Sequence, residues 1–261
     1  MTAETTDFPP RRLYRDPPVI EAVARLTWGS PIAWTLTTPG LLFDALRDDY
    51  PKEPEAQSVI QAEISQPAGS EGITAGFQLR QGPQQMVFSN ADGSRLLMAS
   101  PNSISVHGLP PYEGWEALSN RLFHSVGRIG LLLPKDIRAA AIGLRYINRI
   151  QIPETEVQFQ DWLTIAFALP PSFPQRLSAF MDRAEVLYPD NTSKLSFTWA
   201  SVESPPGTSS FIVDLDLTAE NEPHATIEEA KHILSDLKHK ETAAFEGLLK
   251  DRLREQFDEI V

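Results

Sequence analysis

The amino-acid sequence predicts an α+β protein with two related lobes, each a mainly antiparallel sheet backed by helices. The first observation is a series of short runs in which apolar and polar residues alternate, separated by turn residues such as Gly82-Pro83. The second is that a strand, a helix, several strands and a further helix follow in that order twice along the chain, without a matching sequence repeat. We therefore assign residues 1–16 to an N-terminal tail, 17–135 to a first lobe and 136–261 to a second lobe.

The first lobe begins with a strand over VIEAVARLTW, Val19 to Trp28, whose even-numbered positions are all apolar. A helix is expected after Thr38-Pro39, because proline is tolerated in the first turn of a helix. The runs that follow predict an antiparallel meander and then an amphipathic helix that packs on it. The expected strands are Ser58–Gln66, Ile73–Gln81, Gln85–Asn90, Arg95–Ser100 and Ser103–Gly108, and the expected helix is Tyr112–Ile129.

The second lobe begins with AAAIGLRYINRIQI, Ala139 to Ile152, a long predicted strand that contains two arginines and an asparagine. Thr226 is a good N-cap for a final helix that carries an apolar stripe to the C-terminus. By analogy alone, the order of elements resembles the TATA-binding-protein and helix-grip folds, and a fold does not determine a function. The other expected elements are a short helix Phe159–Ala168 and the strands Leu177–Leu187, Lys194–Val202 and Ser209–Leu217.

Composition narrows the class of protein. The chain has 261 residues, of which 41% are hydrophobic, and no cysteine, which excludes disulfides and thiolate metal sites. No apolar run approaches the roughly 18 residues that a membrane helix needs, and the polar N-terminus lacks the apolar centre of a signal peptide. These features predict a cytoplasmic protein without membrane contact. The net charge of −12 argues against binding to nucleic acid.

Three motifs carry a resemblance to a known family. They are PPVIEAV at the first strand, RYINRI in the central strand and AFEGLLKDRLREQF in the C-terminal helix. In this combination the chain resembles a sporadically distributed bacterial family of similar length, whose function is not established. The resemblance spans nearly the whole chain. It implies a cytoplasmic α+β accessory protein of a bacterial defence or mobile-element system, and it carries over no catalytic residue.

The central strand is the strongest anchor for a binding site. Alternation places Arg145 and Arg149 on one face, with Tyr146 and Asn148 on the other. The functional interpretation is an anion or partner site built on these polar residues. The structural interpretation is an ion pair between Arg145 and Glu21 of the first strand, which would fix the strand register.

Two aspartates, Asp214 and Asp216, lie on one face of a predicted strand whose other face is apolar. Together with a third ligand they would hold a divalent cation, and the protein would then be a metal-dependent enzyme. The preferred interpretation is a solvated polar face, on which an aspartate pairs with an arginine of the central strand. Trp28 and Trp34 bracket the end of the first strand, where they either anchor a partner or seal the core.

Motifs for other chemistry are absent from the sequence, which has no GxSxG, HExxH, GxGxxG or GxxxxGK[ST]. No catalytic residue and no cofactor is therefore predicted. The C-terminal helix is amphipathic with mixed charge, which favours packing within the protein or homodimerisation over membrane binding. The sequence as a whole favours a non-enzymatic accessory protein that recognises another protein. The alternative is a protein that binds a small ligand in an apolar pocket under a curved sheet.

Overall fold

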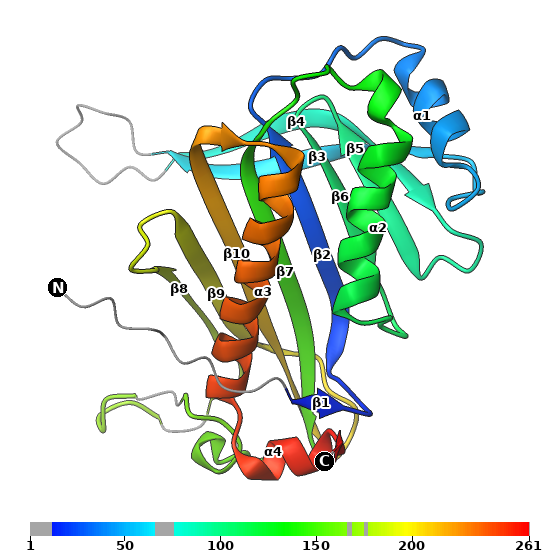
Figure 1. Cartoon of the computed structure of the whole chain (residues 1–261). Coiled ribbons are helices and arrows are strands. Elements are labelled where there is room, and N and C mark those ends of the chain that lie inside the picture. Colours follow the sequence, from blue (N-terminus) through cyan, green and yellow to red (C-terminus); the bar gives the residue numbers. More distant parts are fainter. Residues whose placement is uncertain (1–11, 66–75, 166–168, 175–176, 261) are drawn as a thin grey trace, which may run out of the picture.

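The structure, a computed structural model, describes residues 12–65, 76–165, 169–174 and 177–260. Within these residues nine strands form one antiparallel sheet in the order β3-β4-β5-β6-β2-β7-β10-β9-β8 (Figure 1). The protein is thus α+β with a single large sheet, and the pairing of β2 with β7 joins its two halves. The strands are β2 (Val19–Trp28), β3 (Glu55–Ser65), β4 (Gly76–Ser89), β5 (Arg95–Ser100), β6 (Ser103–Gly108), β7 (Ala139–Ile152), β8 (Met181–Leu187), β9 (Ser193–Val202) and β10 (Ser209–Ala225).

Two long helices lie side by side across one face of this sheet (Figure 1). α2 (Trp115–Arg128) contacts β6 and β2, and α3 (Ile227–Leu248) contacts β10 and β7. Each helix buries a stripe of leucines against the sheet, and full burial of one such side chain stabilises the fold by about 1.5–3 kcal/mol. The buried leucines are Leu118 and Leu122 of α2 and Leu234 and Leu237 of α3. No helix among the described residues is long and apolar enough to cross a membrane.

The start of α3 follows the sequence prediction, whereas its end does not. Thr226 and Glu229 form a capping box, in which the Thr226 side chain accepts from the Glu229 N–H and the Glu229 carboxylate accepts from the Thr226 N–H. The predicted single helix to the C-terminus is wrong, because Leu249 is extended and bridges to Leu163. A short helix, α4 (Asp251–Gln256), follows this break. Tertiary pairing has therefore overridden the helical periodicity of the sequence.

The first-lobe meander has one strand fewer than predicted. Ile73–Gln81 and Gln85–Asn90 were expected as separate strands, but Gly76–Ser89 is continuous, and residues 73–75 lie outside the described chain. The Gly82-Pro83 step falls at a shift in the register between β3 and β4. That part of β4 pairs on one side only, because pairing with β5 begins at Met86. Proline is tolerated at such an edge, since its missing N–H leaves no gap in a second ladder.

Other boundaries also differ. The helix expected over Phe159–Ala168 is only a 3-10 turn, η2 (Phe159–Asp161), and residues 166–168 are not described. β8 begins at Met181 and not at Leu177, while β10 runs on to Ala225. The remaining elements are α1 (Thr38–Leu46), the 3-10 turn η1 (Gly130–Leu132) and a small sheet in which β1 (Leu13–Tyr14) pairs with β11 (Glu259–Ile260). The last residues of the predicted N-terminal tail thus belong to the fold.

Candidate functional site

The sheet has one face that the helices do not cover, which we call the open face. On β2 the residues Ala22, Ala24 and Leu26 are fully buried beneath α2 and α3, whereas the alternate residues are only partly buried. The same alternation continues on β10, where Val213 and Leu215 are fully buried. The open-face side chains of β2 and β10 are therefore partly accessible, whereas Ser105 and His107 on the same face of β6 are buried. The open-face side chains include most of the charged residues of the central strands.

Strand register aligns these side chains in two rows across the open face, because directly opposed residues of neighbouring strands share a face. We name the rows after their first members, the His107 row and the Glu21 row. The His107 row ends on the edge strand β8 at Glu185, and the Glu21 row ends there at Arg183. The His107 row contains His107, Val23, Arg145, Asp216, Ser196 and Glu185. The Glu21 row contains Glu21, Ile147, Asp214, Thr198 and Arg183.

At one end of the rows, a hydrogen-bonded chain joins Ser105, His107 and Glu21. His107 Nδ1 donates to Glu21 Oε1 over 2.7 Å, and His107 Nε2 lies 2.9 Å from Ser105 Oγ. With Nδ1 protonated, the neutral imidazole accepts the serine hydroxyl at Nε2. The hydrogen bond from His107 holds the pKa of the Glu21 carboxyl below its ordinary value, although burial of the carboxyl acts in the opposite direction.

The hydrogen bonds among Ser105, His107 and Glu21 follow the order of a Ser–His–acid triad, but the other parts of an acyl-transfer site are not found around them. Ser105 lies in mid-strand, opposed by Arg25 of β2 on one side and Met98 of β5 on the other. The backbone N–H groups around it therefore belong to the sheet ladders and are not free to stabilise an oxyanion. We interpret the chain as a buried polar network that fixes the relative position of β6 and β2.

In the middle of the rows, Arg145 and Asp214 form a bidentate ion pair, one of the pairings that the sequence predicts for the aspartates. Arg145 Nε and Nη2 donate to the two carboxylate oxygens of Asp214 over 2.8 and 2.6 Å. The hydrogen bonds to Asp214 raise the pKa of Arg145, while burial acts in the opposite direction. The side chain of Asp214 is 15% exposed and that of Arg145 is 43% exposed, so the pair is accessible mainly from its arginine side.

Asp216 occupies a different environment from Asp214. Burial raises the pKa of Asp216 above its ordinary value, and the positive charges of Arg25 and Arg145 offset only part of that effect. The guanidinium group of Arg25 lies close to Gly143 of β7, where a Cβ would be 3.1 Å from Arg25 Nη2. Among the described residues, no three His, Asp or Glu side chains are grouped so as to hold a metal ion. The third ligand that a metal site on the two aspartates requires is thus not found there.

The remaining predicted binding residues do not lie on the open face, with one exception. Trp28 is buried in the core and Trp34 packs against it. Tyr146 and Asn148 are also buried, on the side facing the helices, where Tyr146 Oη lies 2.7 Å from Tyr112 Oη. Asn148 Nδ2 donates to the Val213 carbonyl over 3.3 Å. Arg149 is the exception, because it is exposed and follows Arg145 and Ile147 on the open face.

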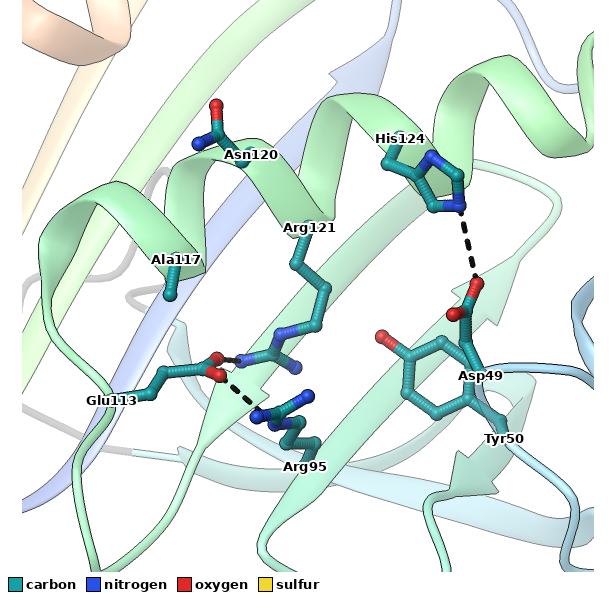
Figure 2. A pocket seen from close by; sticks show the side chains of 8 residues that line it. All are labelled: Asp49, Tyr50, Arg95, Glu113, Ala117, Asn120, Arg121 and His124. Carbon is teal, nitrogen blue, oxygen red and sulfur yellow. Dashed lines mark ion pairs between the residues drawn. The ribbon is translucent and has the colours of Figure 1, made fainter.

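A second candidate site is a pocket of about 430 Å³ beside α2 (Figure 2). Glu113 lies between two guanidinium groups there. Arg121 Nη2 is 2.6 Å from one carboxylate oxygen of Glu113, and Arg95 Nε is 2.9 Å from the other. Further along α2, His124 Nε2 lies 3.3 Å from Asp49 Oδ2 (Figure 2). The lining is thus mostly charged and polar.

Several buried polar atoms of this pocket have no hydrogen-bond partner among the described residues. They are Nε of Arg121, the hydroxyl of Tyr50 and the neighbouring hydroxyl of Ser125. Tyr50 lies beside Arg121 and Ser125. Burial raises the pKa of the Tyr50 phenol. Buried polar groups in native proteins are normally satisfied, so these atoms favour a polar ligand or ordered water beside them.

Ser105, His107 and Arg25 are not among the site residues predicted from the sequence. A signal for the first two exists in SISVHG, where polar residues alternate with apolar ones on a predicted strand. Nothing local marks Arg121 or Glu113, because the pocket brings together segments that are distant in the sequence.

Fold and sites together define an α+β protein built on one large antiparallel sheet, with a charged open face and a polar pocket beside α2. A scan against protein-family models finds no match for the chain, and a search of curated proteins finds no similar sequence. The resemblance to a bacterial family that the motifs suggest therefore stays a prediction.

Proposed function

We propose that the protein is a non-enzymatic binding protein that recognises another protein through the open face of its sheet. The observation that carries this proposal is the pair of polar rows, in which arginines and carboxylates from several adjacent strands lie on a face that no described helix covers. Apolar Val23 and Ile147 lie between the charges in these rows. A surface that mixes apolar contacts with fixed charges of both signs suits specific protein recognition.

The charges of the open face favour a protein partner over nucleic acid. Phosphate binding depends on clustered Lys and Arg. Here the carboxylates of Glu21, Asp214 and Asp216 lie among the arginines, and the chain as a whole carries a net charge of −12. A phosphate backbone laid across the rows would meet repulsion at these carboxylates. A protein partner can instead present the opposite charge at each position.

The test is capture of partners from the native host by the tagged protein and by three variants. Arg149→Glu reverses an exposed charge on the open face, and Arg145→Ala removes the central arginine. Arg47→Glu is the matched control, because Arg47 is an exposed arginine at the end of α1. Thermal unfolding of each variant verifies that it is folded.

We expect a stoichiometric partner to be retained by the wild type and by Arg47→Glu. The Arg149→Glu variant should lose at least tenfold in affinity, which corresponds to about 1.4 kcal/mol. Equal recovery with all variants would contradict the proposal. If Arg145→Ala does not fold, its ion pair serves the strand register, and Arg149→Glu still provides the test.

A small-ligand-binding role is the second candidate, and the pocket beside α2 favours it. A cavity of this size suits a small metabolite. Arg121 Nε and the Tyr50 hydroxyl would donate to a ligand with acceptor oxygens. Native mass spectrometry of the protein from its host should then show a bound small molecule, which a folded Arg121→Gln variant loses. A mass without any adduct would count against this role.

We also propose that the two halves of the chain are related lobes. In each half the first strand pairs with the last strand before the long helix, β2 with β6 and β7 with β10. In each half that helix then packs on the same two strands. This order supports the analogy with the TATA-binding-protein and helix-grip folds. A role in a bacterial defence or mobile-element system stays a prediction of the family resemblance.

A further inference from the structure

The strand β8 lies at one edge of the sheet. All seven of its residues are exposed, and it pairs only with β9 in the described chain (Figure 1). Large apolar side chains are concentrated in and before this strand. They are Phe173, Leu177, Met181, Val186 and Leu187, with Met181 76% and Leu187 74% exposed. An exposed edge of this kind is a template for pairing with another strand.

Backbone hydrogen bonds determine which residues of β8 face the free edge. Tyr188 N–H donates to the Ser193 carbonyl over 3.0 Å, at one end of the β8–β9 hairpin. At the other end, the Phe180 carbonyl accepts from the N–H of Ser201 over 3.0 Å. Even-numbered residues of this stretch therefore direct their backbone groups toward β9, and the odd-numbered ones direct theirs away from it. The residues that face the free edge are Met181, Arg183, Glu185 and Leu187.

We propose that β8 pairs antiparallel with β8 of a second copy of this chain, about a two-fold axis at Ala184. In this register every residue that faces the free edge meets another such residue, so the unpaired backbone groups of both strands form hydrogen bonds. The side chains are self-complementary as well. The opposed pairs are Met181 with the partner's Leu187, Asp182 with the partner's Val186, Arg183 with the partner's Glu185, and Ala184 with the partner's Ala184.

The charges of Arg183 and Glu185 favour β8 of a second copy of this chain over an unrelated strand as the partner of β8. Charged residues on an edge strand usually prevent pairing, because an arbitrary partner leaves them unmatched. In the proposed register each Arg183 lies opposite a Glu185, and the apolar Met181 and Leu187 lie opposite each other at the ends. Ser196 Oγ already donates to Glu185 over 3.2 Å, which places the Glu185 side chain on the open face. Both polar rows would therefore continue from one protomer onto the next.

The first test uses charge reversal. In Arg183→Glu every opposed charge pair becomes Glu with Glu, and in Glu185→Arg it becomes Arg with Arg. Each variant alone should therefore be monomeric in sedimentation velocity. An equimolar mixture of the two should dimerise, because the introduced glutamate of one chain then lies opposite the introduced arginine of the other. The double variant should dimerise by itself for the same reason.

The wild type should be a dimer in the same experiment. A monomeric wild type at tens of micromolar overturns the proposal. A dimer that both single variants retain also overturns it, because that dimer would use another surface. These substitutions lie on an exposed strand, and far-ultraviolet circular dichroism should show unchanged folding.

The second test uses a disulfide, since the chain has no cysteine of its own. Ala184 and the partner's Ala184 form a pair without backbone hydrogen bonds, with Cα atoms about 4.5 Å apart, within reach of a disulfide. Ala184→Cys should thus cross-link under mild oxidation. Asp182→Cys is the matched control, because its two copies would lie roughly 14 Å apart along the strands. Cross-linking of both variants, or of neither, refutes the register.

Discussion

The ion pair between Arg145 and Asp214 offers a quantitative test of how the open face is held together. The perturbation is a double-mutant cycle of Arg145→Ala, Asp214→Ala and the combined variant. A hydrogen bond to a charged group contributes about 1.5–3 kcal/mol where it is buried, whereas an exposed ion pair contributes about 0–1 kcal/mol. Since Asp214 is mostly buried and Arg145 is 43% exposed, we expect a coupling free energy of about 1–2 kcal/mol.

The assay is urea denaturation at neutral pH. The matched control is the same cycle on Arg47 and Asp44, whose atoms lie 3.6 Å apart with side chains 63% and 70% exposed. There the coupling should stay below about 0.5 kcal/mol. If the coupling of Arg145 with Asp214 were no larger than that of the control pair, the argument from burial and bidentate geometry would be refuted.

Three further predictions concern buried polar groups. Burial raises the pKa of Asp216, so the folded chain binds that proton more tightly than the unfolded chain. Asp216→Asn should therefore increase the free energy of unfolding at neutral pH, with a gain that vanishes as the pH falls to the unfolded-state pKa of about 4. Lys240 donates to Asp190 over 2.5 Å. Burial acts to raise the pKa of Asp190, but the hydrogen bonds that Asp190 accepts hold this pKa below its ordinary value. Lys240→Met should cost about 1–3 kcal/mol in urea denaturation, and its curve should converge with that of the wild type in acid, where Asp190 is protonated. Asn148→Ala should cost about 1–2 kcal/mol in the same assay, because the Val213 carbonyl loses a buried donor.

Local patterns in the sequence carry much of the fold. The period of two in VIEAVARLTW predicts both the strand and its buried side, and Ala22, Ala24 and Leu26 are fully buried as that pattern requires. The capping residue of α3 can also be predicted from the sequence, because Thr226 and Glu229 interact within one turn. The break at Leu249 cannot be predicted in this way, because its cause is a bridge to Leu163, which is far away in the sequence.

The open face could be predicted only in part, for the same reason. Alternation within β7 predicts the residues of that strand that share a face with Arg145. The register between strands determines the residue of the neighbouring strand that lies opposite Arg145, and no local pattern in the sequence fixes this register. Glu21 illustrates the difference: the sequence suggests Arg145 as its partner, but its hydrogen bond comes from His107, on a strand at the far end of the first meander.

The contact between β2 and β7 also has a consequence for how the chain folds. Consecutive strands such as β5 and β6 are linked by short connections, and the pairs β2–β6 and β7–β10 within the halves join more distant segments. The contact between β2 and β7 joins residues that are more remote still, such as Leu26 and Ile142. Long-range pairing of this kind forms slowly. Until it forms, each half exposes a long strand edge, which is a template for pairing between molecules. During refolding from denaturant, the pairing of β2 with β7 therefore competes with aggregation. Dilution favours the pairing, because only aggregation depends on the concentration of chains.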